Sequence, residues 1–121
     1  MVKALFDTNI LLDHIKGIEA AWTELSRYED RAISIITVIE VLVGTTASTE
    51  SAERALLAEF AVVPLDRAIA EETAVLRRRH RMKLPDAVIW ASARNQGRLL
   101  VTRNTKDFPA GDPGVRLPYQ L

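Results

Sequence analysis

The 121-residue chain contains no cysteine and only two histidines. Disulfide bonds and thiolate metal sites are therefore excluded, and no cysteine or histidine cluster favours zinc. No apolar run approaches the roughly 20 residues that span a bilayer. An acid at position 7 also interrupts the first apolar segment too early for a signal peptide. We therefore expect a soluble, cytoplasmic protein without a membrane partner, formed by a single domain over residues 1–121.

Several motifs of known chemistry are also missing. The chain has neither the GxGxxG nor the GxxxxGK[ST] pattern of nucleotide-binding loops, and it lacks the GxSxG element of serine hydrolases. Two other α/β classes agree poorly with the acids that are present. Aspartyl-nucleophile phosphatases need a second acid where Asn9 stands, and receiver domains need paired acids after the first strand, where Asp7 stands alone.

The net charge is zero, but the charges are unevenly distributed along the chain. Residues 1–72 carry 6 basic and 13 acidic side chains, a net charge of −7, whereas residues 73–121 carry 10 basic and 3 acidic ones, a net charge of +7. This polarity indicates a face suited to a polyanion or an acidic partner. A solvated helix surface explains the basic run from Arg77 to Lys83 equally well.

Short apolar runs alternate with segments of helical periodicity. The apolar runs predict strands at residues 2–6, 32–35, 61–65, 99–102 and, more weakly, 115–117. Helices are predicted at residues 11–25 with a break near Gly17, and at 37–45, 51–60, 66–83 and 85–96. Uniformly apolar strands separated by helices are typical of a parallel sheet covered on both faces. We therefore expect a three-layer α/β/α domain with a mostly parallel sheet of about five strands, and with Trp22 and Trp90 in its core.

Acids follow two of the predicted strands. Asp7 comes directly after the first strand, and Asp107 lies a few residues beyond the strand that ends at Thr102. Ligands of open parallel sheets bind beyond the carboxyl ends of the strands, so these residues are candidates for one site. Taken alone, Asp7 and Asp86 have a simpler explanation, because an acid at a helix N-terminus is stabilised by the helix dipole.

Glu40 is harder to explain as a surface residue. Its neighbours in residues 35–43 are almost all typical of a protein core, and no Lys or Arg occurs between Arg31 and Arg54. A buried carboxylate needs a cation, a basic partner or an open cavity. Asp86 raises the same question, because the apolar residues 87–90 direct its helix inward. Converging carboxylates favour a hard, oxygen-binding cation such as Mg²⁺ or Mn²⁺.

Four segments in this order resemble the motifs of the PIN-domain nucleases, and most closely the VapC-like toxins of bacterial toxin–antitoxin pairs. They are FDTN at 6–9, IE at 39–40, LPDA at 84–87 and TRNTKDF at 102–108. The resemblance covers essentially the whole chain. It implies a PIN fold, a Mg²⁺- or Mn²⁺-dependent endoribonuclease, a homodimer, a VapB-type antitoxin that inhibits it, and a larger assembly of the pair on operator DNA.

The resemblance also assigns roles to residues. Asp7, Glu40 and Asp86 match three catalytic, metal-holding acids, and Asp107 matches the fourth acid of the TRNxxDF variant. Many relatives carry an acid where Asn104 stands, so Asn104 is given a supporting role and the presence of a second metal is left open. Thr8 and Thr102 would orient carboxylates or substrate. The RNA contacts follow from charge and not from the resemblance, because an acidic pocket repels RNA and basic residues around it must attract the backbone. The candidates are Arg77, Arg78, Arg79, Arg81, Lys83 and Arg103.

In the mechanism that this resemblance implies, a metal held by Asp7 and Asp86 activates water for attack on phosphorus, and Glu40 orients that water. A different class of function stays open at this point. The domain could be a catalytically silent module that uses the PIN scaffold to bind a protein or an operator-DNA complex. Loss of nuclease activity in Asp7→Asn with partner binding retained would separate the two.

Overall fold

The computed structural model describes residues 1–109 and 111–121. A five-stranded sheet runs through its middle, in the order β3-β2-β1-β4-β5, and every pairing in it is parallel. The strands are β1 (Lys3–Phe6), β2 (Asp30–Ser34), β3 (Ala61–Val63), β4 (Leu99–Val101) and β5 (Val115–Arg116). The predicted number and direction of the strands are thereby confirmed.

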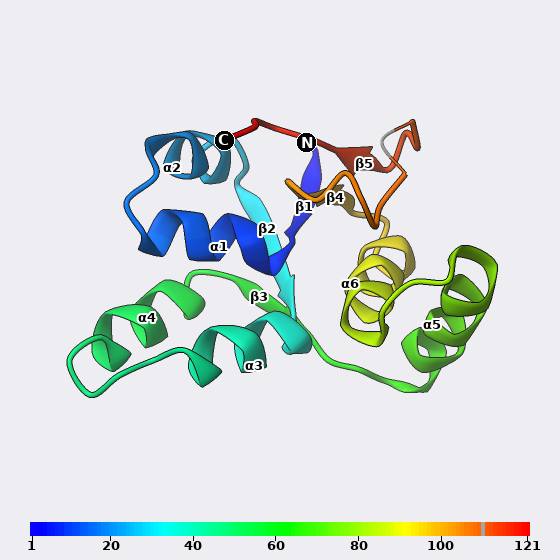
Figure 1. Cartoon of the computed structure of the whole chain (residues 1–121), viewed down its shortest axis with the longest axis horizontal. Coiled ribbons are helices and arrows are strands. Elements are labelled where there is room, and N and C mark those ends of the chain that lie inside the picture. The colour runs from blue at the N-terminus through cyan, green and yellow to red at the C-terminus, as the bar shows by residue number, and fades with distance from the viewer. Residues whose placement is uncertain (110) are drawn as a thin grey trace.

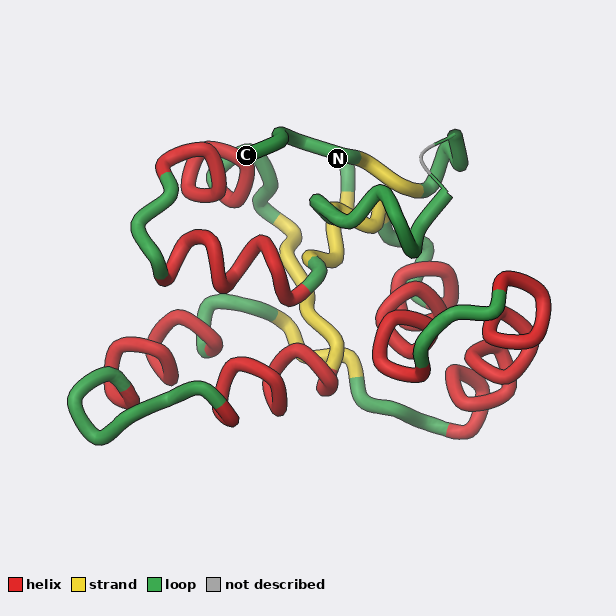
Figure 2. Tube along the Cα trace, viewed as in Figure 1, coloured by secondary structure: helices red, strands yellow, loops and turns green. Residues whose placement is uncertain are grey.

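Helices cover both faces of this sheet (Figures 1 and 2). In the described residues they are α1 (Thr8–Ile15), α2 (Glu19–Leu25), α3 (Ile35–Val43), α4 (Glu50–Leu57), α5 (Arg67–His80) and α6 (Leu84–Asn95). The first four lie on one side of the sheet, and α5 and α6 lie together on the other (Figure 1). The expected three-layer α/β/α architecture is confirmed.

Two apolar cores lie on the two faces, and β1 supplies both of them. Leu5 packs in the core under α5 and α6, whereas Ala4 and Phe6 pack in the core under α1 and α2. All three side chains are fully buried. Successive side chains of a strand point to opposite faces, so a central strand covered on both sides must be apolar at every position.

Several element boundaries follow from local capping. Gly17, at φ +83°, separates α1 from α2 as predicted, because a side chain is disfavoured in that conformation. The carboxylate of Asp66 accepts a hydrogen bond from the backbone N–H of Ile69 and caps α5. Ser34 ends β2 and caps α3 through Ile36, so α3 begins two residues earlier than predicted.

The prediction that Trp22 lies in the core is wrong. Trp90 is buried as expected, but Trp22 is 54% exposed and stacks on His14. The helical spacing of apolar residues before Gly17 does not continue beyond it. After the break at Gly17, α2 starts with a new helical phase, which turns Ala21 and Leu25 inward and Trp22 outward.

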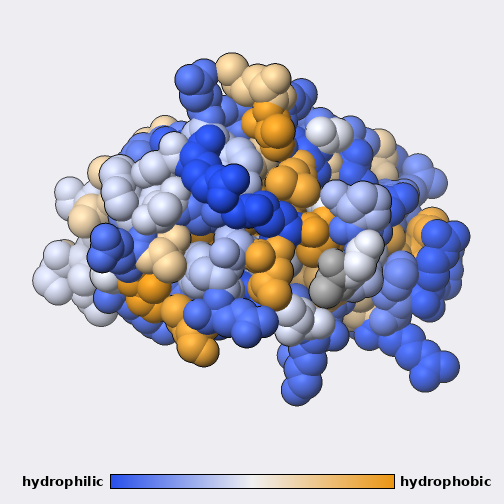
Figure 3. All heavy atoms as spheres, turned by 90° about the horizontal axis from the view of Figure 1, so that it is seen from above, coloured by the Kyte–Doolittle hydropathy of each residue, from blue (hydrophilic) through white to orange (hydrophobic). Residues whose placement is uncertain are grey.

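The face that carries both chain termini in Figure 1 is seen from above in Figure 3. A band of apolar atoms crosses its middle, with polar side chains on either side (Figure 3). Exposed large apolar side chains close to the chain ends are Met1, Val2 and Leu121. Over the part of the chain that the structure describes, no helix is both long and apolar enough to cross a membrane.

Candidate active site at the carboxyl edge of the sheet

Asp7 and Thr102 meet where β1 and β4 end. The parallel register pairs Phe6 with Val101, and the backbone N–H of Asp7 continues it by donating to the Val101 carbonyl at 2.9 Å. The Thr102 hydroxyl then donates to Oδ2 of Asp7 at 2.7 Å, and Asn9 donates to the same oxygen at 3.2 Å. Both Asp7 and Thr102 are almost fully buried. The sheet register therefore places a buried carboxylate at this edge.

Asp7 also caps α1, as the simpler interpretation of this residue predicts. Its Oδ1 accepts a hydrogen bond from the backbone N–H of Thr8 at 2.7 Å. Capping does not account for the electrostatics, however. The pKa of Asp7 is raised from 3.8 to about 6. Burial is the largest cause and the charges of Asp86 and Glu40 add to it, while the hydrogen bonds from Thr102 and Thr8 oppose it. A strongly perturbed carboxylate beside other acids is typical of a functional site.

Glu40 reaches the same edge from α3. Its Oε1 accepts a hydrogen bond from the Thr8 hydroxyl at 2.7 Å, and the hydroxyls of Thr8 and Thr37 are 2.9 Å apart. The expectation that apolar neighbours carry Glu40 into the core is wrong, because Glu40 is exposed and Ile39 is 52% exposed. On this short helix only the Thr37 and Val41 face is buried, so Glu40 lies at the open side of the site.

Asp86 and Asp107 form the remaining part of the acidic edge. Asp86 is half-buried in the first turn of α6, and burial raises its pKa, with further increases from the charges of Asp107 and Glu40. Asn104 donates to Oδ2 of Asp107 at 2.8 Å and accepts the Asp107 backbone N–H at 3.2 Å. Asn104 therefore holds Asp107 in the loop after β4.

The four acids at this edge are candidate ligands for a metal ion. They offer only carboxylate oxygens, the donor type that Mg²⁺ and Mn²⁺ prefer. Yet within residues 1–109 and 111–121, no three His, Cys, Asp or Glu side chains are grouped closely enough to hold one ion. Carboxylates that share a site repel one another. The donor chemistry therefore fits a hard divalent cation. The described side chains are spaced too widely to show which of the acids would bind it.

An ion pair that the sequence did not predict supports the loop after β4. Arg103 donates from Nε and Nη2 to the two carboxylate oxygens of Asp13 on α1, at 2.7 and 3.0 Å. Tyr119, near the C-terminus, donates its hydroxyl to Asp13 at 2.7 Å. Burial alone would raise the pKa of Asp13, but the bonds from Arg103 and Tyr119 hold it below its usual value. Arg103 was predicted as an RNA contact, but its guanidinium group is bound to Asp13 within the protein.

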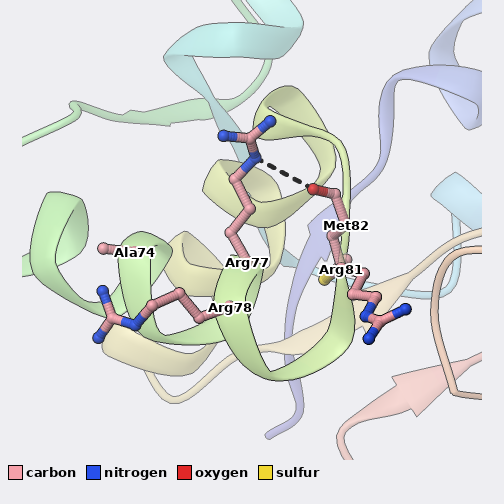
Figure 4. A pocket seen from close by; sticks show the side chains of 5 residues that line it. All are labelled: Ala74, Arg77, Arg78, Arg81 and Met82. Carbon is pink, nitrogen blue, oxygen red and sulfur yellow. Dashed lines mark hydrogen bonds between the residues drawn. The ribbon is translucent and has the colours of Figure 1, made fainter.

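The other predicted RNA contacts lie together at the end of α5. Arg77, Arg78, Arg79 and Arg81 are exposed, and Lys83 is the residue that precedes α6. Ala74, Met82 and three of these arginines line a hollow of about 460 Å³ (Figure 4). The helix ends at His80 and not at residue 83 as predicted, because Arg81 adopts the left-handed conformation, with φ +54°.

Comparison with known proteins identifies the family of this fold. The family model for the PIN domain matches residues 4–111. "Ribonuclease VapC10" of Mycobacterium tuberculosis is 32% identical over 113 residues, which cover 87% of this chain and 85% of that protein.

Solved structures lead to the same family. A chain of a toxin–antitoxin complex from Klebsiella pneumoniae is 44% identical with a TM-score of 0.89, over 98% of this chain and all of that one. A chain of the DNA-bound VapBC complex from Salmonella typhimurium shares the fold at 23% identity, with a TM-score of 0.78 over 96% of each chain. This chain therefore belongs to the PIN-domain family, in its VapC branch.

Proposed function

We propose that this chain is a divalent-metal-dependent endoribonuclease and the toxin of a VapBC-type pair. The observation that carries the proposal is the buried carboxylate of Asp7 close to two other acids. Its pKa is raised to about 6, mainly by burial and also by the charges of Asp86 and Glu40. Three elements far apart in sequence thus bring acids to one edge of the sheet. The relatives support the reaction class, because one is named a ribonuclease and another is part of a toxin–antitoxin complex.

In this proposal Asp7 and Asp86 hold Mg²⁺ or Mn²⁺, with Glu40 and Asp107 beside them. Such a cation, when bound, lowers the pKa of water and stabilises the oxygen that leaves phosphorus. Thr102 keeps Asp7 ionised and oriented through its hydrogen bond to Oδ2. The Thr8 hydroxyl donates to Oε1 of Glu40 and orients this carboxylate, which would position the attacking water from the open side of the site.

The activity is tested by incubating the purified protein with RNA in Mg²⁺ or Mn²⁺ and in EDTA. We expect cleavage only with the metal, and a loss of at least a hundredfold in Asp86→Asn, because one carboxylate ligand is removed. Glu71→Gln is the matched control, since the side chain of Glu71 is 71% exposed on α5. Sequencing of the cleaved ends identifies the RNA target. Metal-independent cleavage, or equal cleavage by Asp86→Asn, would contradict the proposal.

The partners belong to the same proposal: a VapB-like antitoxin, a second copy of the chain, and operator DNA bound by the assembled pair. Exposed apolar side chains on α1 and α3, among them Ile15, Ile39 and Val43, support contact with protein partners. A basic antitoxin side chain placed among the acids would replace the charge of the metal. We therefore expect antitoxin and Mn²⁺ to compete in a titration, and simultaneous binding at undiminished affinity would contradict this account of inhibition.

Expression in a bacterial host tests the toxin role in the cytoplasm, where we place the protein. The chain alone should arrest growth, and co-expression with the adjacent small gene should restore it. Toxicity that survives Asp7→Ala combined with Asp86→Ala would contradict the catalytic assignment.

One observation favours a second candidate, a catalytically silent PIN-scaffold module. Within the described residues, no three acids are close enough together to hold one metal ion. A protein that does not use the site for catalysis would not need such a group. Asp7→Asn separates the two functions. A nuclease loses cleavage in this variant and keeps its partner, whereas a silent module shows no cleavage even in the wild-type protein and an unchanged complex.

A further inference from the structure

The basic turn, defined here as residues 77–83, connects α5 to α6. It contains four arginines, a histidine and a lysine, and it ends three residues before Asp86. Lys83 directly precedes α6, and Asp86 lies in the first turn of that helix. The basic turn therefore borders the acidic edge of the sheet.

Among the residues that the structure describes, the arginines of the basic turn are distinguished from the other arginines by having no acidic partner. Each arginine outside the turn lies within ion-pair distance of a carboxylate; these are Arg27, Arg31, Arg54, Arg67, Arg94, Arg98, Arg103 and Arg116. Within the described residues, the four in the turn form no such pair. Clustered like charges repel one another and do not stabilise the fold, so this concentration points to an anion supplied from outside.

The guanidinium groups are arranged for an extended anion. Arg77 donates from Nε to the carbonyl of Met82 at 3.1 Å, which fixes the side chain while its two terminal nitrogens make no hydrogen bond among the described residues. Figure 4 shows the guanidinium groups of Arg77, Arg78 and Arg81 directed to different sides of the turn. Groups that diverge cannot all close on one small anion, but they can contact successive phosphates of a polymer.

The backbone of the turn supports the same interpretation. Arg81 occupies the left-handed position after α5, with φ +54° and ψ +40°. Glycine or asparagine is favoured at such a helix end, because a longer side chain is strained there. Arg81 thus occupies a position whose backbone conformation favours another residue type. Strain of this kind is typical of functional sites.

From these observations we propose that the basic turn binds the sugar–phosphate backbone of the RNA substrate, with Arg78 and Arg81 as the main contacts. The proposal rests on the proposed function and names the surface that makes it possible. The acids repel a polyanion, so RNA needs positive charge next to them in order to bind. The basic turn supplies that charge close to Asp86. Its guanidinium groups point in different directions, which suits an RNA strand that passes along the site.

The test measures binding of a fluorescently labelled single-stranded RNA by anisotropy, in EDTA, with a gel to verify that the RNA stays intact. Arg78→Gln and Arg81→Gln should each weaken binding several-fold at low salt. Each should also reduce the slope of log affinity against log salt concentration by about 0.7, the value for one phosphate contact on a single strand. Arg67→Gln is the matched control on the same helix, since its side chain is 89% exposed, and it should bind as the wild type does.

Cleavage measured in parallel separates this proposal from the proposed function. At saturating RNA the two variants should keep the wild-type kcat and show a raised KM, because the chemistry at the acids is untouched. Unchanged RNA affinity in both variants would overturn the assignment of the turn, even if the wild type cleaves RNA. Weaker binding in the variants without cleavage by the wild type would support the turn and contradict the nuclease. Unchanged RNA affinity with a weakened antitoxin complex would make the turn a protein-docking surface and overturn the proposal.

Discussion

The hydroxyl of Thr102 donates to Oδ2 of Asp7 at 2.7 Å, and this bond joins two strand ends that are 95 residues apart in the chain. Both side chains are buried. The bond favours the ionised carboxylate, whereas burial and the charges of Asp86 and Glu40 favour the protonated one, and the outcome is an Asp7 pKa of about 6. A metal ion bound at Asp7 would therefore compete with protonation for the same oxygen atoms.

The first prediction concerns the stability of the metal-free protein. The folded pKa of Asp7, about 6, lies above its ordinary value of 3.8, so between these pH values the folded state binds more protons than the unfolded chain. The free energy of unfolding then falls as pH rises from about 4 to 6. Asp86 acts in the same direction, because its pKa is also raised. Asp7 alone accounts for a loss of about 3 kcal/mol, at 1.36 kcal/mol per pKa unit.

Urea unfolding of wild type and Asp7→Asn in EDTA, at pH 5 and pH 8, measures this effect. Asparagine caps a helix as well as aspartate does, so the variant should be as stable as the wild type or more so at pH 8, with a flatter pH dependence. Asp13 and Glu24 have lowered pKa values and lose their stabilisation only at more acid pH, which keeps the two effects apart. A large loss of stability in Asp7→Asn at pH 8 would mean that the charge of Asp7 stabilises the metal-free fold, and it would contradict this prediction.

The second prediction concerns Thr102. Thr102→Val keeps the volume and removes the hydroxyl that lowers the pKa of Asp7. Loss of a hydrogen bond to a charged group, on the order of 1.5 kcal/mol, should move the acid limb of the pH–rate profile about one unit to higher pH. Thr102→Ser should restore the profile. An unchanged profile in Thr102→Val would show that this hydroxyl does not control Asp7.

Much of the fold could be predicted from sequence because it depends on local patterns. The strand ending at Phe6 was found from a uniformly apolar run, since a strand buried on both faces has no polar positions. The caps at Asp66 and the break at Gly17 were found from residue types with strong conformational preferences. The position of Asp7 followed in turn, because a residue directly after a parallel strand must lie at its carboxyl edge.

The errors arose where a side chain depends on the rest of the fold. Glu40 was expected in the core because its neighbours are apolar, but a monomer leaves one face of α3 uncovered, and Ile39 and Val43 are exposed. The contact between Asp13 and Arg103 joins residues 90 positions apart, and neither shows a periodicity or motif that pairs it with the other. Pairings of this kind depend on sheet order and on the path of the C-terminal segment.

The third prediction tests whether Asp13 positions the loop after β4. Tyr119→Phe removes the hydroxyl bonded to Asp13, and Tyr28→Phe removes a matched hydroxyl bonded to Glu24, which pairs with Arg116. Each should cost about 1.5–3 kcal/mol, the range for a hydrogen bond to a charged group.

The two variants should differ in function. Only Tyr119→Phe loosens Arg103, so only it should weaken Mn²⁺ binding measured by calorimetry, because the loop also carries Thr102 and Asp107. Equal Mn²⁺ affinity in both variants would make the Asp13 cluster purely structural.

The last prediction uses the strained end of α5. Arg81 and Gly97 both follow helices with positive φ, +54° and +62°, but one is an arginine and the other the glycine that such a position favours. Arg81→Gly should therefore raise the free energy of unfolding by about 1 kcal/mol, and Gly97→Ala should lower it by about the same amount. A Cβ added at Gly97 meets no atom within 4 Å, so backbone conformation alone determines the loss of stability in Gly97→Ala.

If the basic turn binds RNA, Arg81→Gly gains stability and loses RNA affinity, while Gly97→Ala loses stability and binds RNA normally. Thermal unfolding and anisotropy on the same samples measure both quantities, and a destabilised Arg81→Gly would contradict the strain on which this trade-off depends.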